Sequence, residues 1–170
     1  MADRSQSEPA LVLFSERLTS SAAFGVLFRE GMDLVEETAA YLDGDGRTEA
    51  KALERSVSLT YATESMRLTT RLMQLASWLL LHRAVKEGEM TLTQANREKT
   101  KVKLSAADPG PEDMIAKLPQ QLQDLIARSV SLQARVRRLD TTIHAPSAER
   151  APIGNPLVPQ LNRLKAAFEQ

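Results

Sequence analysis

Residues 61–81 read YATESMRLTTRLMQLASWLLL and lie within a longer stretch whose composition favours helix. From about Arg47 to Glu87 the chain contains neither proline nor glycine, the two residues that most often interrupt a helix. Because an α-helix rises about 1.5 Å per residue, this stretch predicts one continuous helix of roughly 60 Å. It is the longest element that the sequence predicts.

Two apolar stripes run side by side along the predicted helix 47–87. One stripe contains Tyr61, Leu68, Leu72, Leu75 and Leu79, and its neighbour contains Ala62, Met66, Thr69, Met73, Ala76 and Leu80. Together they cover about half of the circumference, which exceeds the roughly 100° stripe of a helix that meets a single neighbour. We therefore expect this helix to bury its surface against two partners.

The most apolar part of this helix follows Ser77, where residues 78–81 leave no polar face. Such a stretch belongs in a core or at a subunit interface, since a large exposed apolar patch is unusual on a monomer. The residues that we expect in the core or in a dimer interface are Leu72, Leu75, Trp78 and Leu79. The sequence thus predicts a homodimer.

A second helix is predicted upstream, over about 20–43. Ser20 or Ser21 supplies its N-cap, because a serine hydroxyl can accept a hydrogen bond from a free backbone N–H of the first turn. The helix should end at residues 43–46, where Gly44 and Gly46 stand, since glycine readily adopts the left-handed conformation that ends helices.

Downstream, a short helix is predicted over about 92–99, with a capping box formed by Thr91 and Gln94. A third long helix is predicted over about 119–143, beginning at Pro119. Its apolar residues follow the 4-3 rhythm of long, nearly parallel bundle helices, broken only by Ser129. The full set is Leu118, Leu122, Leu125, Ser129, Leu132, Val136, Leu139 and Ile143.

The predicted architecture is therefore all-α: an elongated three-helix bundle over residues 20–143, with a flexible arm at each end. Residues 1–19 are mostly polar, and residues 144–170 contain four prolines that forbid a continuous helix. Residues 161–168 could form one short amphipathic helix, either free or docked on the bundle. Its apolar residues Leu161, Leu164 and Phe168 are candidate anchors for a partner.

Composition excludes several classes of function. Of the 170 residues, 22 are Lys or Arg and 22 are Asp or Glu, whereas a dedicated nucleic-acid binder usually carries a basic excess. The chain has no cysteine, so thiolate catalysis, thiolate metal sites and disulfides are ruled out, and a reducing cytoplasm fits. No apolar run approaches the roughly 18 residues of a membrane span. We expect a cytoplasmic protein that does not bind nucleic acid directly.

The inventory of catalytic and metal-binding groups is small. His82 and His144 lie far apart without a ligand-spaced partner, and His82 is predicted to pack at the end of a helix. Residues 43–46 resemble the start of an EF-hand loop, but Arg47 and Thr48 occupy its fifth and sixth positions, which require an oxygen ligand and a glycine. We expect no metal and no cofactor.

Arg67 and Arg71 are the charged pair most suggestive of a binding site. They lie four residues apart on one face of helix 47–87, close to Gln74, and could bind an anion or a partner. A solvated or salt-bridged polar face, with Glu64 pairing to Arg67, is the preferred interpretation. A small all-helical enzyme would need arginines pointing inward, and these are predicted to point away from the apolar arc.

One set of segments is more specific than composition. Residues 61–81, the upstream segment LVEETAAYLDG at 34–44, the segment AVKEGEMT at 84–91 and the helix around 128–140 resemble the regulator of CtrA degradation (RcdA) family of alphaproteobacteria. The resemblance covers roughly residues 20–143. The two ends of the chain contribute little to it.

The resemblance implies a dimeric three-helix bundle that acts as an adaptor and is not an enzyme. Members of the RcdA family help the ClpXP protease to degrade cell-cycle regulators such as the transcription factor CtrA, together with a receiver-domain partner and a cyclic-di-GMP-binding adaptor. This implies a cytoplasmic protein that can be recruited to a cell pole, with no catalytic residue to carry over. A structural or co-regulatory helical dimer without protease delivery is the alternative, and composition and periodicity alone do not choose between the two.

Overall fold

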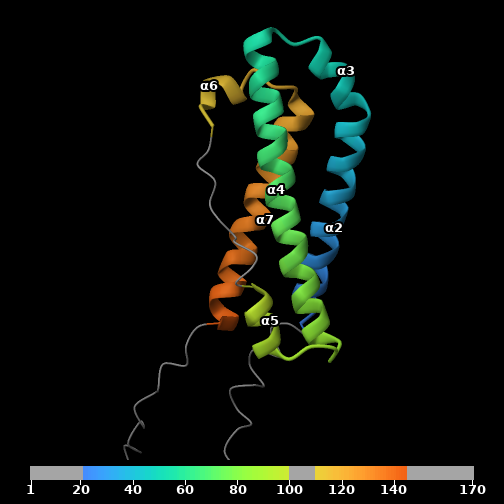
Figure 1. Cartoon of the computed structure of the whole chain (residues 1–170), viewed down its shortest axis with the longest axis vertical. Helices are drawn as coiled ribbons and strands as arrows, with labels where there is room; N and C mark the ends of the chain where they lie inside the picture. The colour runs from blue at the N-terminus through green and yellow to red at the C-terminus, as the bar shows by residue number, and fades with distance from the viewer. Residues whose placement is uncertain (1–20, 100–109, 145–170) are drawn as a thin grey trace, which may run out of the picture.

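The computed structural model describes residues 21–99 and 110–144, and in these two ranges it contains six helices and no strand. The three long helices are α2 (Ala22–Asp43), α4 (Arg55–Lys86) and α7 (Gln120–His144). The short ones are α3 (Asp45–Lys51), α5 (Leu92–Lys99) and α6 (Glu112–Ile115). Helices α4 and α7 run parallel to each other and antiparallel to α2, which makes an elongated three-helix bundle (Figure 1). The predicted all-α fold is confirmed.

The ends of α2 show where local signals hold and where they fail. Ser21 is the N-cap, and its Oγ accepts a hydrogen bond from Phe24 N at 3.3 Å. At the other end Gly44 interrupts the helix for a single residue, with φ −108°, outside the left-handed region predicted for it. The left-handed glycine is Gly88, with φ +76°, directly after α4.

The prediction of one continuous helix from 47 to 87 is wrong, because the helix is interrupted at residues 52–54. There Glu54 adopts an extended conformation, and a new helix begins at Arg55. The break lets α3 fold against the end of α2, where the Tyr41 hydroxyl donates to Glu49 Oε2 at 2.6 Å. Only a glycine fits at position 46 in α3, because a Cβ there would lie under 3.0 Å from both the Tyr61 hydroxyl oxygen and the Tyr41 carbonyl oxygen. Tertiary packing here overrides uniform helix propensity.

The core is formed by the first predicted stripe of α4 together with the heptad residues of α7 and the inner face of α2. Leu72, Leu75, Trp78 and Leu79 are all buried within one chain, at 4% exposure or less. They are core residues and are not available for a dimer interface. The Trp78 indole N–H donates to Asp140 Oδ1 at 2.8 Å, which ties α4 to the end of α7.

Helices α2 and α4 pack closely at Gly31 on α2. A Cβ at this position would lie under 3.0 Å from Leu79 Cδ1 and 3.6 Å from Leu132 Cδ2. The outer edges of α2 and α7 are joined by two ion pairs, Arg135 with Glu30 and Arg128 with Glu37. The α2–α7 side is therefore closed by charge pairs. Separately, no helix in the described ranges is long and apolar enough to span a membrane.

Candidate protein-binding surface

Arg71 lies between α4 and α7, so the prediction that it points away from the apolar arc is wrong. It is 9% exposed, and its Nη1 donates to Ser129 Oγ at 2.8 Å. The Ser129 hydroxyl in turn donates to Ile126 O at 2.7 Å. This explains why serine interrupts the heptad of α7: a leucine would leave a buried guanidinium without this acceptor. Desolvation lowers the pKa of Arg71, an effect that the nearby Glu64 carboxylate opposes.

Arg67 takes part in a different contact. Its Nη1 lies 2.8 Å from Oε1 of Glu64, a carboxylate that is 4% exposed. Gly110 packs directly over this pair, because a Cβ there would lie under 3.0 Å from Glu64 Oε1. The two arginines therefore face different partners, and within the described ranges the half-buried Gln74 is hydrogen-bonded to neither of them. Arg67 is salt-bridged, as the preferred interpretation held, while Arg71 belongs to the core.

The buried histidine, His82, packs against Trp78 on the same helix, α4. His82 stacks on Trp78 with ring centroids 3.9 Å apart, and its Nδ1 lies 2.9 Å from Trp78 O. This agrees with its predicted packing role. Across residues 21–99 and 110–144, no group of three His, Asp or Glu side chains is arranged to hold a metal ion.

The second predicted stripe of α4 faces solvent. Its large members Met66, Met73 and Leu80 are 53–72% exposed, and Leu59, which lies seven residues before Met66 and outside the predicted stripe, is 72% exposed. The small residues Ala62, Thr69 and Ala76 lie beside them. We call these seven residues the α4 strip. The expectation that helix 47–87 buries both stripes is therefore wrong for the single chain, because α2 and α7 together cover only the first one.

A groove with a volume of about 330 Å³ runs between α2 and α4, next to the α4 strip. On α2 it is lined by Val35, Thr38, Ala39, Leu42 and Asp43, and on α4 by Thr69, Leu72, Met73 and Ala76. The Thr38 hydroxyl lies in this lining, and Thr38 is 3% exposed. Among the described residues its Oγ1 has no hydrogen-bond partner. We call this feature the α2–α4 groove.

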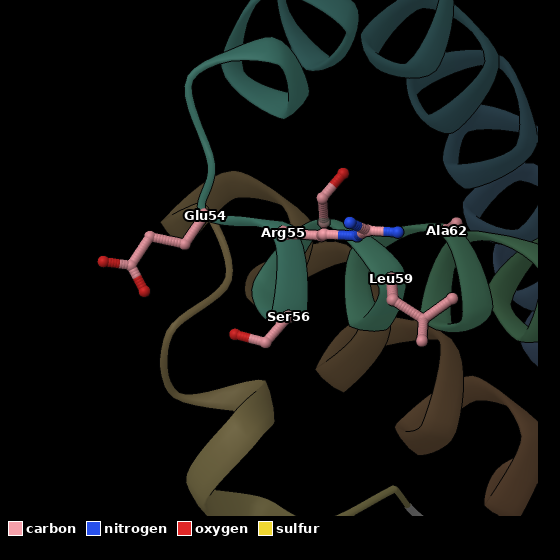
Figure 2. Close-up of a pocket in the computed structure, with 6 residues that line it drawn as sticks. Glu54, Arg55, Ser56, Leu59 and Ala62 are labelled. Atoms are coloured by element: carbon pink, nitrogen blue, oxygen red, sulfur yellow. The ribbon is translucent and has the colours of Figure 1, made fainter.

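A second hollow lies at the first two turns of α4, where Glu54, Arg55, Ser56, Ser58, Leu59 and Ala62 line it (Figure 2). In this view the Glu54 carboxylate points away from the helix. Leu59 and Ala62 belong both to this hollow and to the α4 strip. One apolar path therefore leads from the start of α4 along its solvent face to the α2–α4 groove.

Of the residues predicted to bind partners, Leu161, Leu164 and Phe168 lie outside the described residues. The sequence identified the residues of the α4 strip other than Leu59, but predicted them to be buried. It gave no signal for Thr38, because a threonine inside an amphipathic helix is unremarkable until its neighbours are known. The exposed apolar surface is found only from the packing of three helices.

Comparisons with known proteins agree on one family. The family model described as "Protein of unknown function (DUF1465)" matches residues 15–168. No curated protein matches the chain. Among solved structures, the crystal structure of RcdA from Caulobacter crescentus CB15 is 49% identical, with a TM-score of 0.64. The match covers 78% of this chain and 99% of that one.

Proposed function

The chain belongs to the DUF1465 family, together with RcdA, and from this premise we propose that it is a protein-binding adaptor in regulated proteolysis. It would assist the ClpXP protease in the cytoplasm, with a receiver-domain partner, in degrading cell-cycle regulators such as CtrA. The observation that carries the proposal is the 49% identity with RcdA over 99% of that chain.

The surface of the bundle supports a binding role better than catalysis. The buried charged groups Arg71 and Glu64 are engaged in structural contacts: Arg71 with Ser129, and Glu64 with Arg67. What the bundle presents to solvent is the α4 strip, four large apolar side chains in heptad spacing on a rigid helix. Exposed apolar patches of this kind mark protein interfaces on small proteins.

The proposed homodimer would use the α4 strip. Heptad spacing suits pairing with another long helix, and the small residues of the strip would allow two backbones to approach closely. The proposed interface is the second stripe of α4, beside the core residues that the sequence suggested. Covering Leu59, Met66 and Leu80, the large residues of the strip that do not line the α2–α4 groove, would remove exposed apolar side chains of this helix from water.

Degradation in a reconstituted system tests the adaptor role. Purified ClpXP, the receiver-domain partner and CtrA are incubated with and without the chain, and CtrA is quantified over time. An adaptor shortens the half-life of CtrA severalfold, and only when the receiver-domain partner is present. An unchanged half-life with all components present would refute delivery and favour the alternative, a helical dimer without protease delivery.

Light scattering at micromolar concentration tests the dimer. The chain mass is 18.8 kDa, so the dimer should give about twice that value. Met66→Asp places a charge in the strip and should give a monomer with unchanged helicity. Thr63→Asp is the matched control, since Thr63 is exposed on the polar side of the same helix and its change should leave the mass doubled. A dimer that tolerates Met66→Asp would place the interface elsewhere.

A further inference from the structure

The α2–α4 groove has the form of a seat for one more helix. Its walls are two antiparallel helices, and the lining residues on each recur at intervals of four and three: Val35, Ala39 and Leu42 on α2, and Thr69, Met73 and Ala76 on α4. This is the spacing with which helices pack in bundles. A helix laid between the walls would be the fourth member of the bundle.

The groove has defined ends. Toward the start of α2, the groove ends at Phe28, whose ring is covered by the Arg83 guanidinium, 4.9 Å from the ring centroid. Toward the end of α2, it ends where Arg47 pairs with Asp43 at 3.3 Å. The open part spans seven steps along each wall, or about 10 Å at 1.5 Å per residue. A two-turn helix fits this length.

The floor and rim of the groove indicate which helix would bind. Thr38 lies at the base of the groove, and its buried hydroxyl lacks a partner among the described residues. The rim on α2 carries the exposed carboxylate of Glu36, one heptad before Asp43, which itself pairs with Arg47. The fitting ligand is therefore a short amphipathic helix with basic residues beside its apolar face.

We propose that the occupant of the α2–α4 groove is residues 161–168 of the same chain. Their sequence, LNRLKAAF, places Leu161, Leu164 and Phe168 on one helical face with Arg163 and Lys165 beside it. This segment also spans seven steps and so matches the groove in length. With the segment seated, its apolar residues are withheld from other partners, which makes the groove a competitor for any partner that binds them.

The intervening chain is long enough. The pairing of Arg135 with Glu30 and of Arg128 with Glu37 places the end of α7 level with the start of α2. From there the groove begins at Val35, 13 residues along α2, or about 20 Å. Residues 145–160 can span roughly 50 Å when extended. Tethering also raises the effective concentration of the segment at the groove into the millimolar range.

Paired cysteines in the full-length chain test the proposal, because the natural chain contains none. Ala39→Cys in the groove wall is combined with Ala167→Cys, the pair is oxidised mildly, and products are separated without reductant and mapped by mass spectrometry. We expect an intrachain disulfide at least tenfold more abundant than with Ala40→Cys and Ala167→Cys. Ala40 is the matched control, since it follows Ala39 and is likewise exposed but lies outside the groove.

Adding Leu164→Asp to the Ala39–Ala167 pair should abolish the excess of intrachain product, because a charge cannot enter the apolar groove. Equal yields from the two cysteine pairs, or an unchanged yield with Leu164→Asp, would overturn the proposal. A predominantly interchain disulfide would also overturn it and would assign the groove to a second copy. Circular dichroism of each variant confirms that the bundle is intact. The readout does not depend on whether the chain delivers clients to a protease.

Discussion

Replacing Ser129 by alanine should destabilise the bundle far more than the loss of one hydroxyl on a helix surface would. The Ser129 hydroxyl accepts the hydrogen bond from Arg71 Nη1 at 2.8 Å, in a site where Arg71 is 9% exposed. A hydrogen bond to a charged group contributes about 1.5 to 3 kcal/mol, and a buried donor left without its acceptor loses this in full. We expect the free energy of unfolding to fall by about 2 kcal/mol, and Tm by roughly 4 to 8 °C.

A double-mutant cycle separates this contact from general packing. Arg71→Met removes the guanidinium together with its desolvation cost, while Ser129 keeps its hydrogen bond to Ile126 O. We expect this change alone to alter the free energy of unfolding by less than about 1 kcal/mol. In the Arg71→Met background, Ser129→Ala should then have little further effect, so the coupling between the two positions is about 1 to 2 kcal/mol.

Urea unfolding followed by circular dichroism at one fixed protein concentration measures all four proteins, because the stability of a dimer depends on concentration. Ser77→Ala is the control: its hydroxyl donates to Met73 O at an exposed position of α4. Its effect should stay within about 0.5 kcal/mol. If Ser129→Ala also stays within that range, or if the coupling is absent, Arg71 does not depend on Ser129 and the account of the interrupted heptad is wrong.

Three further changes follow from the packing. Gly31→Ala should lower the free energy of unfolding by about 1 kcal/mol, since a clash with Leu79 costs roughly 1 to 3 kcal/mol and helix propensity returns about 1; a higher Tm on thermal melting would contradict it. Thr38→Val should raise the urea midpoint, by about 1 kcal/mol in free energy, because it replaces a buried hydroxyl without a partner; a lower midpoint would show that the hydroxyl is bonded. Burial raises the pKa of Tyr41, and its hydrogen bond to Glu49 adds to this. The neutral phenol therefore stabilises the fold below pH about 10, and this stability is lost as the pH rises further. Tyr41→Phe should reduce the difference between urea midpoints measured at pH 8 and pH 11, and an equal difference would refute the linkage.

The sequence by itself determined the helical class and the core. Leu68 and Leu75 in α4 are seven residues apart, as are Leu125 and Leu132 in α7. This spacing places each pair on one face of its helix, and all four residues are buried in the structure. The N-cap at Ser21 could be predicted for the same reason, because a capping hydroxyl acts within a few residues of the chain. The resemblance to the RcdA family depended on local sequence as well, and the comparison with a solved structure confirmed the family.

The tertiary structure alone decided which apolar face meets water and which polar groups are buried. Periodicity showed two stripes on α4, but only the packing of α2 and α7 determines that Met66 and Met73 remain exposed. Arg71 looked like a surface residue because its charge, taken alone, favours water. It is buried because Ser129, 58 residues later, supplies the acceptor that makes burial tolerable. The interruption of the helix at residues 52–54 is also decided by tertiary contacts. Helix propensity is uniform there, and the break is set by what α3 gains in packing against α2. Such contacts join residues distant in sequence, so no local pattern can encode them.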